Sequence, residues 1–254
     1  MFTSKQKTEL TNAANNSLNI AEDIWDKVGD QLIKGANEQR NFSLEAMDSQ
    51  IPGHPSVDIG NPKVDNFIAI VADMRKSTEH LMCRISPKTA KVTQLQRVFY
   101  ETAALLPSLA KAIRLEGGNV TEYLGDGVLG LFCLGEEVDK QKIYAANRAA
   151  KKCIAATKEI VNPILDDRYS LPNLDIGVGM AYSKAVVTLV GLPDSMQPKV
   201  FGECVFRATK LSSGSNTIVI DEALEHLWPT SKTGTISFLK KEIKGVTGFE
   251  IQNK

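Results

Sequence analysis

Residues 119–132 read Asn-Val-Thr-Glu-Tyr-Leu-Gly-Asp-Gly-Val-Leu-Gly-Leu-Phe. Two short apolar runs flank Gly125-Asp126-Gly127, and an Asp-Gly pair between strand-like runs predicts a β-hairpin, because both central turn residues can adopt positive φ. A carboxylate at the tip of such a hairpin stands clear of both strands. Asp126 is therefore either a metal ligand or a turn residue that bonds its own backbone.

A second carboxylate ends another apolar run. The uncharged residues Phe67 to Ala72 predict a buried strand, Asp73 follows directly, and Ser77 and Thr78 are typical caps of a following helix. Because ligands of open sheets bind beyond the strand ends, this carboxylate and the one on the hairpin could share divalent ions. Oxygen ligands favour Mg²⁺ or Mn²⁺. Helix capping is the alternative role, but the pair of carboxylates favours a metal site.

Composition narrows the classes of protein. The 254 residues include 30 basic and 30 acidic side chains, so there is no basic excess of the kind that nucleic-acid binders carry. No apolar run reaches the roughly 18 residues of a membrane span, and the first residues lack the apolar centre of a signal peptide. We therefore expect a cytoplasmic protein that binds neither nucleic acid nor membrane.

The cysteines and histidines show no metal-binding spacing. Cys83, Cys133, Cys153 and Cys204 are far apart and form no Cys-x-x-Cys pair, which indicates reduced, mostly buried thiols. The three histidines, His54, His80 and His226, are equally scattered. We expect no zinc site, and we expect His54 to be a solvated loop residue.

The first 62 residues are predicted to form a helical extension and a linker, and residues 63–254 a single domain. An apolar stripe with helical spacing occupies Leu18, Ala21, Trp25, Val28 and Leu32. We expect this helix to pack on its own domain or on a twin subunit. Residues 50–63 contain three prolines and two glycines and predict a connector without regular structure.

The rest of the chain predicts an α+β fold. Helices are expected at 92–113, 136–165 and 203–211, and strands at 67–72, on both sides of the hairpin, and at 174–181, 185–191, 217–220, 236–244 and 249–252. The early part gives the order β-α-β-β-α-β, a ferredoxin-like core with appended strands. Gly177-Val-Gly179 opens no helix, so it is not a dinucleotide fingerprint.

Five segments, at 67–78, 118–132, 174–191, 200–210 and 241–252, resemble in their order the catalytic domain of class III nucleotidyl cyclases. The resemblance implies a head-to-tail homodimer with sites at the interface, where one subunit supplies the metal-binding aspartates and the other supplies basic groups. It also implies that Asp73 and Asp126 bind two divalent ions, Mn²⁺ or Mg²⁺, and that the Met74 carbonyl contacts one of them.

The departures from the family pattern concern base recognition. Glu122 stands where adenylate cyclases have Lys and matches the guanylate type, whereas Lys199 matches neither. The segment 123–127, with Tyr123 two places before Gly125-Asp126, resembles the corresponding segment of the bacterial pyrimidine cyclases of Pycsar anti-phage defence. A bulky Tyr123 would shrink the pocket to one ring, while Lys199 could donate to a base carbonyl and Glu122 could accept from an N–H. The alternatives are strand filler for Tyr123 and a solvated loop lysine for Lys199.

The resemblance also places charges around the phosphates. Phe206 stands where the family has Asn, and Lys210 where it has Arg. Lys210 or Arg207, together with Lys244, would neutralise charge on the phosphates, unless they are plain surface charges. The expected reaction turns UTP, or else CTP, into a 3′,5′-cyclic mononucleotide that a separate effector reads. The rivals are a guanylate cyclase and a degenerate domain that binds nucleotide without turnover.

Overall fold

The structure is a computed structural model that describes residues 2–32, 46–58, 62–82, 90–135, 137–191, 195–229 and 234–253. Its strands are β1 (Ala46–Asp48), β2 (Ser56–Asp58), β3 (Lys63–Met74), β4 (Asn119–Tyr123), β5 (Gly127–Cys133), β6 (Ile176–Val190), β7 (Gln197–Gly202), β8 (Ile218–Asp221), β9 (Ile236–Ile243) and β10 (Val246–Asn253). Its helices are α1 (Ser4–Leu32), α2 (Ser77–Met82), α3 (Gln94–Arg114), α4 (Lys140–Ala156), α5 (Asn162–Tyr169), α6 (Glu203–Leu211) and α7 (Glu222–Leu227).

The predicted ferredoxin-like core is confirmed. One eight-stranded sheet has the order β4-β5-β3-β6-β8-β10-β9, with β7 paired to β6 outside this path. Its first four strands, together with α3 and α4, follow the chain order β3-α3-β4-β5-α4-β6, and β3 runs antiparallel to both of its neighbours. The strands after β6 are the predicted appendages.

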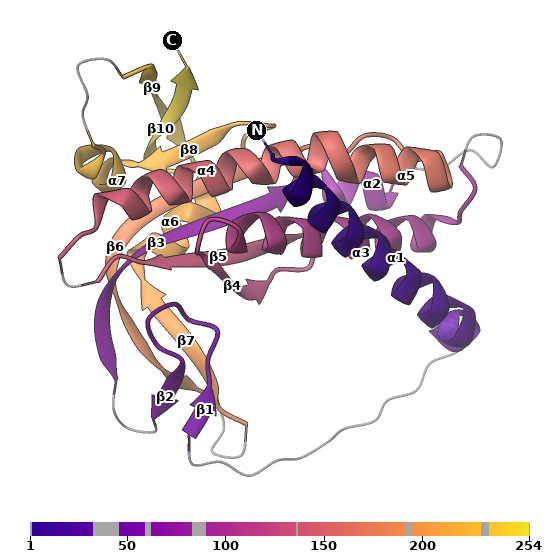
Figure 1. Ribbon diagram of the computed structural model, residues 1–254, viewed down its shortest axis with the longest axis horizontal. Helices are drawn as coiled ribbons and strands as arrows, with labels where there is room; N and C mark the ends of the chain where they lie inside the picture. The colour runs from indigo at the N-terminus through magenta and orange to yellow at the C-terminus, as the bar shows by residue number, and fades with distance from the viewer. Residues whose placement is uncertain are drawn as a thin grey trace.

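The two faces of the sheet are covered differently. Alternate residues of β3 point to opposite faces, so Ile68 and Ile70 pack in one core cluster while Phe67 and Ala69 pack in another. Helices α3 and α4 cover the first face, and α6 with the β1–β2 hairpin covers the second (Figure 1). Helix α3 begins at a capping box in which Thr93 and Gln96 satisfy each other's backbone N–H groups.

Three local predictions were wrong. The connector contains strand β2, which pairs with β1 just before the connector in a small antiparallel hairpin that lies beside β7 in Figure 1. The two strands expected between 174 and 191 are the single strand β6, whose first part pairs with β8 and whose later part pairs with β7. The helix expected over 136–165 is α4, a π-helical turn at Thr157–Val161, and α5.

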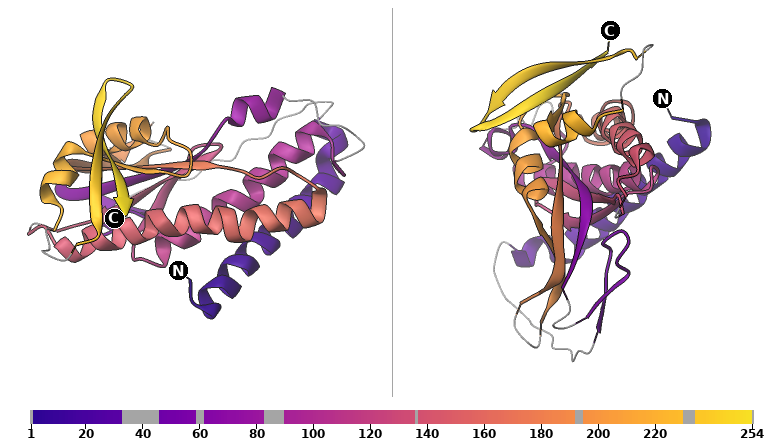
Figure 2. Two further views of the ribbon diagram at one scale, coloured as in Figure 1. Left: turned by 90° about the horizontal axis from the view of Figure 1, so that it is seen from above. Right: turned by 90° about the vertical axis from the view of Figure 1, so that its left-hand side faces the viewer.

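Helix α1 packs on its own chain. Leu10, Ala14 and Leu18 are fully buried, and Glu9 forms an ion pair with Lys111 of α3 at 2.9 Å. Of the predicted stripe, the side chains of Ala21, Trp25, Val28 and Leu32 lie outside the described residues. The β9–β10 hairpin, at the other end of the chain from α1, projects from the main body of the molecule (Figure 2). Among the helices described, none has the length and apolar character needed to cross a bilayer.

Candidate metal and nucleotide site

The hairpin turn between β4 and β5 carries Asp126, but its geometry differs from the prediction. Positive φ occurs at Gly125 (84°), whereas neither Asp126 nor Gly127 has it. Leu124 N–H donates to the Gly127 carbonyl at 2.8 Å across the turn. The two-residue turn is therefore Gly125-Asp126 and not Asp126-Gly127, which is the pattern of a type II′ hairpin with glycine first.

Strand pairing brings Asp73 and Asp126 together. Asp73 lies opposite Gly127 in the β3–β5 ladder, and Met74 N–H donates to the Asp126 carbonyl at 3.1 Å. A Cβ at Gly127 would lie 2.7 Å from the Ala72 carbonyl and 2.8 Å from Asp73 Oδ1. Only a glycine therefore allows the strand to pass this close to the Asp73 carboxylate.

The Asp73 carboxylate is half-buried beside a cation of its own chain. Burial raises its pKa above the usual range, as does the neighbouring Asp126 carboxylate, while the charges of Arg75 and Lys244 act in the opposite direction. Arg75 Nη2 donates both to Asp73 Oδ2 and, at 3.2 Å, to the Met74 carbonyl. One guanidinium nitrogen thus takes two of the oxygens that the resemblance assigned to metal, one from Asp73 and the Met74 carbonyl, and leaves Asp126 out. This donor set fits a divalent cation, because it already holds a positive group.

A cavity of about 540 Å³ adjoins Met74 and Asp126. Its lining includes Met74 and Asp126 from the carboxylate site and His80, Phe99 and Glu101 from α2 and α3. Burial lowers the pKa of His80 and raises the pKa of Glu101. The volume is in the usual range of small-molecule sites, so Asp126 and Met74, next to Asp73 in the chain, border a space that can accept a ligand.

The predicted base-recognition residues lie on two strands whose side chains meet. Lys199 of β7 and Glu122 of β4 form an ion pair at 3.1 Å, and about a third of each side chain remains exposed. Tyr123, the next residue on β4, is 61% exposed. One donor and one acceptor thus lie side by side, whereas the accessible ring of Tyr123, the next residue of the strand, points to the other face of β4.

Helix α6 lies directly on β6 because two strand residues have no side chain. A Cβ at Gly177 would lie 1.9 Å from the Ser212 carbonyl, and one at Gly179 would lie 2.0 Å from the Ala208 carbonyl. This close approach is the role of the Gly177-Val-Gly179 sequence. It fixes the position of every side chain that α6 presents.

The side chains of α6 separate into two groups. Arg207 binds Glu203 at 2.7 Å and Asp221 at 3.4 Å. Asp221 is buried, which raises its pKa, and it caps α7. Phe206 is 67% exposed, and Lys210 is exposed without a hydrogen bond or ion pair to any residue that the structure describes. Arg207 therefore has a structural contact that Lys210 lacks.

Comparisons with solved structures show what this architecture resembles. The guanylyl cyclase Cya2 superposes with a TM-score of 0.61 at 19% identity, covering 75% of this chain and 93% of that one. The adenylyl cyclase CyaB from P. aeruginosa gives a TM-score of 0.56 at 18% identity, with 76% and 97% covered. The catalytic core of a rhodopsin-guanylyl cyclase with converted specificity, in complex with ATPαS, gives 0.56 at 15%, with 77% and 100% covered.

The chain has the fold of a nucleotidyl cyclase catalytic domain. The identities lie below 20%, so these structures establish the fold of the chain and leave its substrate open. No protein-family model and no curated protein matches the sequence.

Within the cyclase fold, Lys244 occupies the turn between β9 and β10. Lys244 and Gly245 both have positive φ, 50° and 76°, as a two-residue type I′ hairpin requires. The Lys244 side chain is exposed. The turn therefore presents this charge to solvent.

Two features were missed from the sequence. Arg75 was not expected to bind Asp73, although a cation two residues from a carboxylate was a signal for it. His54 was expected in solvent, yet it is buried, with 7% exposed, and it meets Asp65 and Cys133. The prediction of buried thiols is confirmed for Cys133, Cys153 and Cys204, while Cys83 lies outside the described residues.

Proposed function

We propose that this chain is a nucleotide cyclase that converts a pyrimidine nucleoside triphosphate, UTP or else CTP, to the 3′,5′-cyclic mononucleotide and pyrophosphate. The observation that carries the proposal is the meeting of Asp73 and Asp126 beside a cavity, with a cationic nitrogen on Asp73 Oδ2 and on the Met74 carbonyl. These oxygens would hold two divalent ions, Mn²⁺ or Mg²⁺. Bound there, such ions supply the Lewis acidity that activates the ribose 3′-hydroxyl and neutralises the triphosphate.

The side chains of the chain would orient the nucleotide. Lys199 would donate to O4 of uracil while Glu122 accepts from N3–H; on cytosine the same pair would donate to N3 and accept from the amine. The edge of guanine offers the same carbonyl and N–H as uracil, so this pair alone does not exclude GTP. The preference for a single ring rests on Tyr123, the residue after Glu122 in the chain, whose bulk would narrow the pocket if its ring bounds the base.

Charge on the phosphates would be met by Lys210 and Lys244. Lys210 is the better candidate on α6, because Arg207 is held by Glu203 and Asp221. Phe206, exposed on the same helix, would offer its ring to the nucleotide. A lysine provides a point charge where the family has a forked arginine, so we expect looser orientation of the phosphates.

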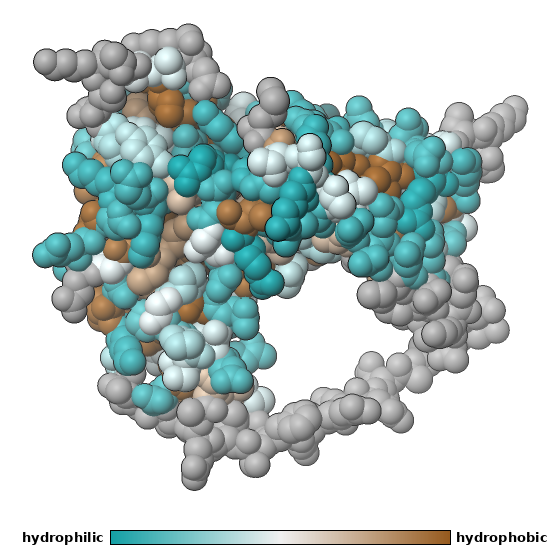
Figure 3. Space-filling model, in the orientation of Figure 1, coloured by the Kyte–Doolittle hydropathy of each residue, from teal (hydrophilic) through white to brown (hydrophobic). Residues whose placement is uncertain are grey.

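Exposed apolar side chains support a homodimer that completes the site. On the β3-β6-β7 part of the sheet, Val64, Val186 and Phe201 form one row across three strands, and all three are exposed. Tyr123 and Phe206 are exposed as well. Apolar groups of this kind are typical of interaction surfaces. On the face shown in Figure 3 hydrophilic side chains predominate, and hydrophobic ones form small separate groups.

The biological role that we propose is production of a second messenger for anti-phage defence, read by a separate effector. It rests on the likeness of residues 123–127 to the Pycsar cyclases.

The test is turnover with each of the four nucleoside triphosphates and Mn²⁺, with products separated by chromatography. We expect cyclic UMP, or else cyclic CMP, and we expect its loss in Asp73→Asn and Asp126→Asn but not in Asp166→Asn, a matched change of an exposed aspartate on α5. Cyclic GMP as the main product would replace the pyrimidine proposal with the guanylate rival. If a folded, metal-loaded protein forms no product, the alternative of a degenerate domain that binds nucleotide without turnover is favoured.

A second variant tests the pocket. Tyr123→Ala should raise turnover of GTP relative to UTP, because it removes the bulk that restricts the base to one ring. An unchanged ratio would mean that Tyr123 does not bound the base pocket.

A further inference from the structure

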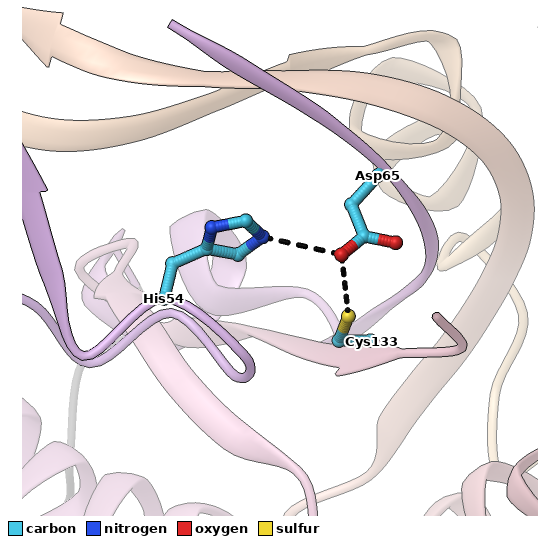
Figure 4. A group of neighbouring side chains, drawn as sticks. All are labelled: His54, Asp65 and Cys133. Carbon is cyan, nitrogen blue, oxygen red and sulfur yellow. Dashed lines mark hydrogen bonds and ion pairs between the residues drawn. The ribbon is translucent and has the colours of Figure 1, made fainter. Parts of the chain in front are cut away.

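Three side chains of metal-binding type meet on the face of the sheet that the β1–β2 hairpin covers. His54 comes from the β1–β2 turn, Asp65 from the start of β3 and Cys133 from the end of β5 (Figure 4). Asp65 Oδ2 lies 3.3 Å from His54 Nε2 and 3.2 Å from Cys133 Sγ. All three ligand atoms lie within 4.8 Å of one another.

The surroundings of the cluster leave these atoms facing one another. His54 is 7% exposed and Cys133 8%, and the buried His54 Nε2 makes no hydrogen bond to any described group. Asp65 Oδ1 accepts from the Asn66 N–H at 2.7 Å, which orients the carboxylate and directs Oδ2 at the other two side chains. Its polar contact among the described residues is Asp65 Oδ2 at 3.3 Å, which does not form a well-aligned hydrogen bond. A buried nitrogen without such a bond is costly, which favours a ligand held between the imidazole and the carboxylate.

The turn is built for a close approach. Gly53 has φ +81°, and a Cβ there would lie 3.0 Å from Cys133 Sγ. The His54 N–H donates to the Ile51 carbonyl at 3.0 Å, which fixes the backbone that carries the imidazole. The imidazole is therefore held against the sheet and does not depend on a mobile loop.

We propose that His54, Asp65 and Cys133 bind one Zn²⁺ ion through Nε2, Oδ2 and Sγ. Nitrogen, oxygen and sulfur are the ligands of this metal, and its bonds of roughly 2.0–2.3 Å separate neighbouring ligands by about 3.4 Å in a tetrahedron. The two measured distances, 3.2 and 3.3 Å, are close to this edge length. The thiol gives its proton to solvent on binding, and one carboxylate and one thiolate then balance the charge of the ion.

The Zn²⁺ site would be separate from the candidate active site. It lies near the start of β3 and the end of β5, whereas Asp73 is the second-last residue of β3 and Asp126 precedes β5. Asp65 and Asp73 are separated by about 26 Å of strand at the usual rise per residue. The ion would fasten the β1–β2 hairpin to β3 and β5, two strands of the main sheet.

The experiment uses the full chain, purified without chelator and without a histidine tag. Excess Mg²⁺ fills the oxygen ligands at Asp73 and Asp126, and the protein is then titrated with Zn²⁺ for elemental analysis and with Co²⁺ for absorption. We expect one equivalent of zinc, a thiolate-to-cobalt charge-transfer band, and a higher thermal midpoint with Zn²⁺. Cys133→Ser and His54→Gln should lose all three, whereas the controls Cys204→Ser and Asp73→Asn should keep them.

Two results would overturn the proposal. One is wild-type protein that binds no zinc under these conditions, or binds Co²⁺ without a thiolate band; the three side chains are then a hydrogen-bonded group. The other is zinc binding that persists in folded Cys133→Ser and His54→Gln or is lost in Asp73→Asn. Wild-type protein without the zinc equivalent or without the band refutes the proposal even if a variant fails to fold, and this outcome is independent of nucleotide turnover.

Discussion

Replacement of Arg75 by methionine should make metal binding at Asp73 easier. In the structure Arg75 Nη2 donates to Asp73 Oδ2 and to the Met74 carbonyl, so a divalent ion must displace it. Methionine keeps an unbranched apolar stem and removes the charge. The variant therefore tests whether an internal cation competes with the metal.

The size of the effect follows from the exposure of the pair. A hydrogen bond to a charged group contributes about 1.5–3 kcal/mol when buried, and an exposed ion pair about 0–1 kcal/mol. The two side chains are 20% and 26% exposed, so we expect about 1–2 kcal/mol, which is about 5- to 30-fold in the dissociation constant of the metal. Without metal the variant should be less stable, since it leaves the Asp73 carboxylate without its cation.

Calorimetric titration with Mn²⁺, in the absence of nucleotide, measures the dissociation constant directly. Arg114→Met, a change of an exposed arginine at the end of α3, is the matched control and should leave it unchanged. If the Arg75→Met protein binds Mn²⁺ as tightly as the parent or more weakly, Arg75 does not compete with the metal. The guanidinium on Asp73 Oδ2 and the Met74 carbonyl would then not mark a metal position.

Three further predictions concern other parts of the site. Gly179→Ala should lower the free energy of unfolding by about 1–3 kcal/mol in urea, because its Cβ meets the Ala208 carbonyl; an unchanged midpoint would mean that α6 can shift freely. Because the pKa of Asp73 is raised, the affinity for Mn²⁺ should begin to fall at a higher pH than at an ordinary aspartate, and a fall that begins only in the ordinary carboxyl range would contradict this. At neutral pH the ionised form of Asp73 opposes folding, so metal-free Asp73→Asn should be no less stable than the parent. A lower thermal midpoint of the variant would contradict this second expectation. Lys199→Ala should change the ratio of UTP to CTP turnover, and an equal ratio would remove Lys199 from base recognition.

Most of the core could be predicted because its signals are local. The uncharged run before Asp73, the glycines around Asp126 and the helical spacing after Gly202 each define an element within a dozen residues. The order of these elements then places the strands. The meeting of the two aspartates follows from the β3–β5 pairing that this order implies.

The remaining features depend on contacts that no local pattern encodes. The strands β1 and β2 have three residues each, too few to show alternation, and prolines lie between them and after β2. His54 reaches Cys133 only through the folding of three separate segments. The glycines of β6 were visible in the sequence, but their purpose appears only when the α6 backbone lies against them.

Strand β6 continues without a break from the centre of the sheet into the part that pairs with β7. The part of β6 that pairs with β7 and the part in the centre of the sheet therefore belong to one continuous strand, with no loop between them. A displacement of the β7-paired part by a docking subunit would be transmitted along this strand to its first residues, where Gly177 lies opposite Asp73.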